Sequence, residues 1–338
     1  MKSFLSSLLG GKGEPTGPLT KKGLLASDLW VDQPYAHEQI AGKLRRGEID
    51  GDTAVRLTQF VKQGFLTFPL RDAGAAIDDV VESIDRAWRE KPAELAYAYH
   101  SPLKLFPLAD ETAERKPSYR IADLHSYSEG ALDLYLNREI FLLLELILGR
   151  EAVATQSLTF EFGSQQELHR DPVHVQMSPP SHLLAAWIAL EDIDPACGPL
   201  TYVPGSHHLP YFRFPDGDYR LHAGRHGEKE VREAAEFDRR ECEKAGLRRE
   251  AFTPKRGEVL LWHHSLLHGG SVPENSALTR RSFVVHYTSR ENYPRQRQTV
   301  LVPGEGGGPP KSRTVGTDRL LTRDGARGFD NPLRGTAQ

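Results

Sequence analysis

The apolar positions of the first 150 residues mostly follow helical spacing. They predict short helices between His37 and Gln63 and a longer helix over Ala73–Glu90. The strongest pattern runs from Leu132 to Leu148, and Gly149 follows it as a C-cap. A buried strand is expected between them at Gly64–Leu70. We therefore predict that this part of the chain is a helical layer around something else.

Beyond residue 150 the pattern changes to short alternating or fully apolar runs, separated by Gly, Pro and Asp. The predicted strands are Ser157–Gly163, Leu183–Glu191, Gly198–His207, Gly257–His264 and Arg281–Tyr287. Several short strands at regular spacing favour a two-sheet jelly roll. The expected fold class is mainly β with helices (α+β), with the helical layer packed on one sheet of the jelly-roll core.

We expect one main domain with extensions. Its parts are an N-terminal arm (1–35), the domain itself (36–300, with the helical layer at 36–150 and the core at 151–300), and a C-terminal tail (301–338). The tail is rich in Gly and Pro and is predicted to be loosely ordered. A charged insertion at 213–250 is either a solvated surface segment or a lid over the pocket mouth.

Composition narrows the class of protein. With 338 residues, 38% hydrophobic and 26% charged, the chain resembles a globular domain, and it contains no apolar run long enough to span a bilayer. A formal net charge of -3 provides no basic field for a nucleic-acid partner. The 2 cysteines are too few for a disulfide framework, and the N-terminus does not resemble a secretory signal. We therefore expect a cytoplasmic protein without membrane or nucleic-acid partners.

Candidate chemistry begins at His169 and Asp171, which are two positions apart in the sequence QELHRD. On an extended strand their side chains leave the same face and can converge. His268, which precedes a Gly pair about a hundred residues later, can complete a set of two imidazoles and one carboxylate. That set is typical of non-haem Fe(II) oxygenases, where it leaves three coordination positions open. Structural zinc sites usually have four Cys and His ligands instead.

A family resemblance follows from the order of several motifs. HRD, the segment Trp187–Pro210 and the segment His268–Tyr287 occur in the order and spacing of the phytanoyl-CoA dioxygenase family, which the chain resembles from Gly64 to about Tyr287. Members of this family are Fe(II)- and 2-oxoglutarate-dependent oxygenases. The resemblance implies a double-stranded β-helix core in which His169, Asp171 and His268 hold the iron.

The resemblance also implies that Arg280 binds the far carboxylate of 2-oxoglutarate. A buried carboxylate needs a cation with fork geometry, and arginine supplies it. Arg281, the next residue, should face the opposite side of the strand. Trp187 lies where the family often packs a residue on the co-substrate, and a core tryptophan on a buried strand is an equal alternative.

The function implied is a 2-oxoglutarate-dependent non-haem iron dioxygenase. It would use dioxygen to hydroxylate a C–H bond of a small molecule or natural product, releasing succinate and CO2. Asp171 favours hydroxylation or another oxidation over halogenation, because related halogenases lack that carboxylate. The alternatives are a metal-binding jelly-roll protein without turnover and a metal-dependent hydrolase. Arg120, His125 and the insertion are the places to look for substrate contacts, and His174 could line the pocket. The histidine pairs at 207–208 and 263–264 are expected to be structural.

Overall fold

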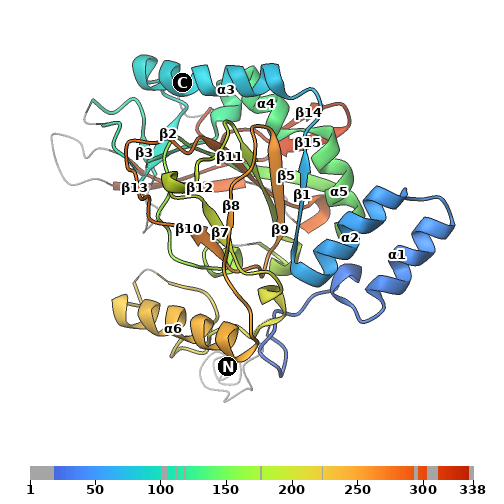
Figure 1. The fold of residues 1–338 in the computed structure, drawn as a ribbon. Coiled ribbons are helices and arrows are strands. Elements are labelled where there is room, and N and C mark those ends of the chain that lie inside the picture. Colours follow the sequence, from blue (N-terminus) through green and yellow to red (C-terminus); the bar gives the residue numbers. More distant parts are fainter. Residues whose placement is uncertain are drawn as a thin grey trace, which may run out of the picture.

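The computed structural model describes residues 19–99, 105–111, 113–117, 119–175, 177–222, 224–292, 296–302 and 311–334. A 10-stranded, largely antiparallel sheet dominates this part of the chain, as Figure 1 shows. Its main path runs β1 (Phe65–Pro69), β9 (Glu258–His263), β6 (Leu184–Ala189), β11 (Ser282–Ser289), β5 (Ala152–Phe160), β4 (Arg120–Ala122), β2 (Ala96–Ala98) and β3 (Phe106–Pro107). A smaller sheet consists of β10 (His268–Gly270), β7 (Leu200–Tyr202) and β8 (Glu250–Phe252). The predicted jelly-roll class is confirmed.

The alternation of side chains along the strands gives the large sheet two different faces. On β6, Ala185, Trp187 and Ala189 belong to an inner cluster that includes Tyr202 and Phe252 of the small sheet. The alternate positions of the same strands belong to a second and larger cluster with the helices. The interior between the two sheets is therefore lined by every second residue of β5, β6, β9 and β11.

Helices cover the outer face of the large sheet. The helix α3 (Gly74–Glu90) buries Ile77, Val80 and Ile84 in the larger cluster, as its helical spacing predicts. Two further helices, α1 (Ala36–Arg45) and α2 (Gly51–Gln63), precede β1. None of the described helices combines the length and the apolar character that a membrane span needs.

One predicted helix is two helices. The segment Leu132–Leu148 forms the end of α4 (Glu129–Tyr135) and then α5 (Arg138–Leu148). The break occurs because the side chain of Asn137 accepts hydrogen bonds from the backbone N–H groups of Glu139 and Ile140, which caps a new helix. The predicted C-cap is correct, since Gly149 adopts the left-handed conformation with φ 68°.

The expectation of a loosely ordered tail is wrong for residues 311–334, whereas 303–310 lie outside the described residues. The strand β13 (Lys311–Thr317) pairs with β12 (Gln296–Val302), and β14 (Leu320–Arg323) pairs with β15 (Ala326–Phe329). β15 also lies parallel to β5 in the large sheet. The tail is ordered there because it buries apolar side chains such as Ala326 in the larger cluster.

Candidate metal centre

The first and last of the three predicted ligands lie opposite each other on neighbouring backbone segments. His169 and His268 form an isolated antiparallel bridge with N···O distances of 2.9 and 3.0 Å. Asp171 begins a short 3-10 helix directly after the His169 segment. Its Oδ1 lies 3.8 Å from Nε2 of His169 and 3.4 Å from Nε2 of His268. One ligand atom from each residue lies within 4.8 Å of the others, which is the spacing of a metal site.

The two imidazoles are held in the tautomer that a metal requires. Nδ1 of His169 lies 2.8 Å from the carbonyl oxygen of Glu167, and Nδ1 of His268 lies 3.0 Å from that of Leu266. A carbonyl can only accept, so each Nδ1 carries the proton and each Nε2 presents its lone pair. The two Nε2 atoms lie 3.8 and 3.4 Å from Oδ1 of Asp171, and that of His169 also accepts from the side-chain amide of Gln166 at 3.3 Å. Backbone geometry thus prepares both nitrogens for coordination.

Asp171 is a buried carboxylate that stays ionised. Burial alone would raise its pKa, but the imidazoles of His268 and His286 beside it hold the pKa well below its usual range. The indole of Trp262 donates to Oδ2 of Asp171 at 2.8 Å. Oδ1 is therefore the oxygen available to a metal.

The Gly pair after His268 is required by close backbone approach. A Cβ on Gly269 would lie 2.5 Å from the carbonyl oxygen of Gln166, and one on Gly270 would lie 2.5 Å from the hydroxyl of Ser164. Any larger residue would push β10 away from the segment that carries His169. The motif HGG thus sets the distance between the two imidazoles.

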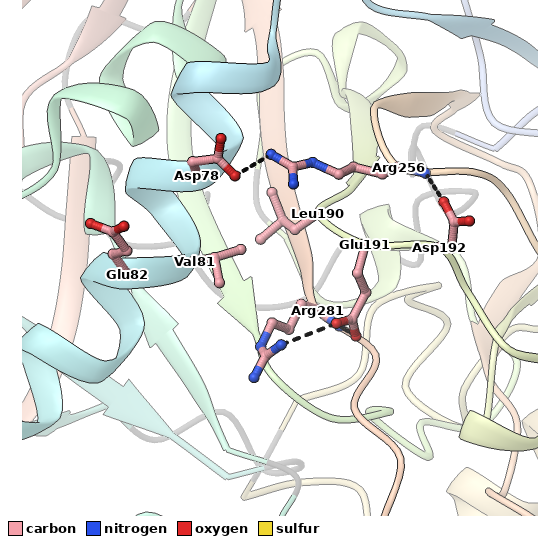
Figure 2. A pocket seen from close by; sticks show the side chains of 8 residues that line it. All are labelled: Asp78, Val81, Glu82, Leu190, Glu191, Asp192, Arg256 and Arg281. Atoms are coloured by element: carbon pink, nitrogen blue, oxygen red, sulfur yellow. Dashed lines mark hydrogen bonds and ion pairs between the residues drawn. The ribbon is translucent and has the colours of Figure 1, made fainter.

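Arg280 and Arg281 point to opposite faces of the large sheet. The guanidinium of Arg280 is buried on the inner side, where its Cζ lies 5.6 Å from the ring centroid of Phe160 and 5.9 Å from that of Trp187. Arg281 pairs with Glu191 at 3.2 Å. Figure 2 shows this pair in a surface pocket beside α3, on the outer side.

Arg280 has no carboxylate partner among the described residues. Its Nη1 makes one long hydrogen bond of 3.4 Å to the carbonyl of Gly198, and its Nε has no partner. Burial lowers the pKa of Arg280 to about 10. Trp187 lies beside Arg280, and its buried indole N–H has no partner among the described residues. Trp187 belongs to the inner core and is also a wall next to Arg280, so its surroundings fit both predicted alternatives.

A profile of the phytanoyl-CoA dioxygenase family matches residues 73–282, which is more than half of the chain. The chain belongs to the phytanoyl-CoA dioxygenase family. The match includes all three residues of the candidate centre and Arg280. No curated protein matches the sequence.

Solved structures share the fold of this family member. The non-heme alpha ketoglutarate dependent carbocyclase SnoK from nogalamycin biosynthesis is 16% identical with a TM-score of 0.51, over 72% of this chain and 85% of that chain. EctD from S. alaskensis in its apoform is 18% identical with a TM-score of 0.50, over 72% of this chain and 78% of that chain. At these identities the likeness establishes the fold and not the reaction.

A second group, Asp32, His263 and His264, also has metal-like spacing in this family member. Its hydrogen bonds differ from those of the candidate centre. The backbone N–H of Ser265 donates to Nδ1 of His263, so Nε2 carries the proton and donates it to Oδ1 of Asp32 at 2.8 Å. A protonated Nε2 cannot bind a metal. We interpret this group as a buried hydrogen-bonded contact that attaches the N-terminal segment to β9.

The other candidates from the sequence fall into two places. His174 stacks edge-on against His169, with 5.4 Å between ring centroids, so it lies at the centre. His125 lies on the helical side instead, stacked on Tyr135 at 3.8 Å and hydrogen-bonded to Ser157. His125 is therefore a packing residue and does not line the metal centre.

Two side chains at the centre, Trp262 and His286, carry no motif signal in the sequence. Nε2 of His286 lies 3.8 Å from Oδ2 of Asp171, and its Nδ1 is bonded to the side chain of Gln156. Both residues occupy alternate, inward-facing positions of β9 and β11. The alternation of side chains along β9 and β11 could have identified these two residues, but only after it was known which positions face the interior.

Proposed function

We propose that this family member is an Fe(II)- and 2-oxoglutarate-dependent dioxygenase that hydroxylates a C–H bond of a small molecule. His169, Asp171 and His268 would hold the iron. The observation that supports this assignment best is a set of three unprotonated donor atoms that lie within 4.8 Å of one another. They are Nε2 of His169, Oδ1 of Asp171 and Nε2 of His268. The donor chemistry fits Fe(II), because two imidazoles and one carboxylate leave room for further ligands.

The role proposed for Arg280 is to anchor the co-substrate. A buried guanidinium without a carboxylate is costly, and a dicarboxylate bound at the metal would bring the missing charge. Two observations support this role. Arg280 lies on the inner face of the sheet that carries His286, and its Nε has no hydrogen-bond partner among the described residues. Trp187 would form one wall of the same space.

Iron and 2-oxoglutarate together would supply the oxidation of the substrate by dioxygen, with release of succinate and CO2. The chain's own task is placement. Leu266 and Glu167 fix the imidazole tautomers, Trp262 fixes the carboxylate, and the inner cluster of apolar side chains keeps water away from the reacting atoms. Because Asp171 occupies the carboxylate position, hydroxylation is proposed over halogenation.

The decisive experiment compares Asp171→Ala with Asp32→Ala, one carboxylate from each His/Asp group. Fe(II) binding by calorimetry and succinate formation with dioxygen uptake are measured for the wild type and both variants. We expect the wild type to turn over 2-oxoglutarate, Asp171→Ala to lose metal binding and turnover while remaining folded by circular dichroism, and Asp32→Ala to keep both. Iron binding without dioxygen uptake in any condition would indicate a metal-binding protein instead, and full metal affinity in Asp171→Ala would mean that the ligands are misassigned.

A further inference from the structure

A second buried arginine faces the interior of the jelly roll. Arg120 is 3% exposed and lies on β4. No carboxylate of the described residues pairs with it, its Nε has no partner, and Nη2 makes only a long contact of 3.5 Å with the carbonyl of Tyr99. Burial alone lowers its pKa, to about 10. Among the described residues, the five guanidinium donors thus have one weak acceptor.

The strand register fixes the direction of this side chain. Arg120 lies directly opposite Phe160 of β5, which in turn lies opposite Ser282 of β11. Paired residues of adjacent strands share a face, and Phe160 belongs to the inner cluster. The neighbour of Arg120, Ile121, belongs to the outer cluster with the helices. Arg120 therefore points inward.

Arg120 and Arg280 lie on the same aromatic ring. Their Cζ atoms are 5.9 and 5.6 Å from the ring centroid of Phe160. A cation over a ring gains some attraction but gives its N–H groups no acceptor.

We infer that the substrate carries an anionic oxygen group, a carboxylate or a phosphate, which binds Arg120. The inference rests on the proposed function, in which the far carboxylate of 2-oxoglutarate occupies Arg280. One co-substrate carboxylate accounts for one buried guanidinium, and the second guanidinium needs a second oxyanion with fork geometry. That group belongs to the substrate, because in the proposed function the two carboxylate ends of 2-oxoglutarate are directed to the metal and to Arg280.

The test measures binding and not turnover. The wild type is loaded anaerobically with Mn(II) and saturating 2-oxoglutarate, so that Arg280 is occupied, and tryptophan fluorescence follows the titration of three probes: benzoate, phenyl phosphate and neutral benzamide. We expect one anion to bind at least 10-fold more tightly than benzamide, and the better anion identifies the group. Arg120→Gln should abolish this preference while changing the affinity for 2-oxoglutarate less than twofold. Arg115→Gln, which removes a nearby arginine already paired with Glu161, should keep the preference.

Two results with the wild type and Arg120→Gln would overturn the inference. One is a wild type that binds benzamide as tightly as both anions. The other is an Arg120→Gln variant that loses 2-oxoglutarate as Arg280→Gln does, which would place Arg120 in the co-substrate site. If Arg120→Gln does not fold, Arg120→Lys replaces it and should retain anion preference with reduced affinity; an unchanged affinity would also overturn the inference. This binding test is independent of the turnover assay for the proposed function. A protein that binds the anion here but does not consume 2-oxoglutarate in that assay would refute the proposed function and leave the anion site intact.

Discussion

The indole of Trp262, on β9, donates its N–H to Oδ2 of Asp171 at 2.8 Å. This bond fixes which carboxylate oxygen faces the two imidazoles. Both groups are buried, so water cannot replace the indole. Trp262, which contacts a predicted ligand and is not itself a ligand, therefore determines how the carboxylate is presented to a metal.

Replacing Trp262 with Phe should weaken Fe(II) binding by about 10- to 100-fold, the usual effect of removing a hydrogen bond that orients a metal ligand. The apolar ring is retained, so the core should remain packed. Metal titration by calorimetry measures the change. Trp187→Phe serves as the control, since its indole N–H has no partner among the described residues and that variant should bind iron normally.

Arg280→Ala should raise the dissociation constant for 2-oxoglutarate by about two to four orders of magnitude, because losing one side of a buried ion pair costs about 3–5 kcal/mol. Arg281→Ala should change it by less than about threefold, since that guanidinium is partly exposed and pairs with Glu191 on the outer face. Binding of 2-oxoglutarate to the Mn(II)-loaded protein measures both. Equal losses in the two variants would contradict the assignment.

The sequence pattern predicts a helix or strand of this protein well where a single local feature, such as the burial of that segment, produces the pattern. The continuous apolar run at Leu183–Glu191 gives β6, and the opposite directions of Arg280 and Arg281 follow from the strand that comes after them. The spacing of His169 and Asp171 brings the metal set together once His268 is placed opposite. These features depend on neighbours in sequence.

Features that depend on long-range contacts could not be predicted. The break before α5 arises from the Asn137 cap inside an uninterrupted apolar pattern, since Leu136 is itself buried. The order of residues 311–334 depends on a place beside β5, which is far away in sequence. The same holds for Trp262, whose role follows from which strand lies across from Asp171.

Acid should destabilise the fold through its buried neutral histidines. Burial lowers the pKa of His125 to about 3 and that of His207 to about 2. The pKa of each of these histidines in the folded protein lies below the unfolded value of about 6.5. Their contribution to stability is complete above about pH 6.5 and shrinks as the pH falls below it, because the unfolded chain takes up the proton first. Between pH 7 and 5 each such histidine should cost about 2 kcal/mol.

Urea unfolding at pH 7 and pH 5 checks this pH dependence. His125→Gln should reduce the loss of unfolding free energy between the two pH values by about 2 kcal/mol, whatever it does to the stability at pH 7. The exposed His37 gives the matched variant, and His37→Gln should leave the loss unchanged. The same pH dependence in His125→Gln as in the wild type would show that this imidazole is not held neutral.

The last prediction concerns the insertion at 213–250, which contains α6 (Glu228–Lys244). No residue of α6 is buried, so little apolar packing holds the helix on the domain. Arg170, between two predicted metal ligands in the chain, is buried and lies 3.1 Å from Asp238 of α6. It also donates to the carbonyl of Pro210 and lies over the ring of Tyr211. The helix is thus linked to the ligand segment mainly by polar contacts.

We expect α6 to act as a lid whose order depends on the metal centre. Its amides should exchange quickly in the apoprotein and become protected when Mn(II), 2-oxoglutarate and substrate are bound, because ligands that fix His169 and Asp171 also fix Arg170 between them. Asp238→Asn should remove this coupling and leave α6 unprotected in both states. Glu236→Gln on the exposed side of the same helix, where Glu236 pairs only with arginines of α6, should behave like the wild type. Hydrogen exchange by mass spectrometry measures the three proteins with and without ligands. Equal protection of α6 in both states of the wild type would make the insertion a surface segment and return the covering of the pocket to the N-terminal loops.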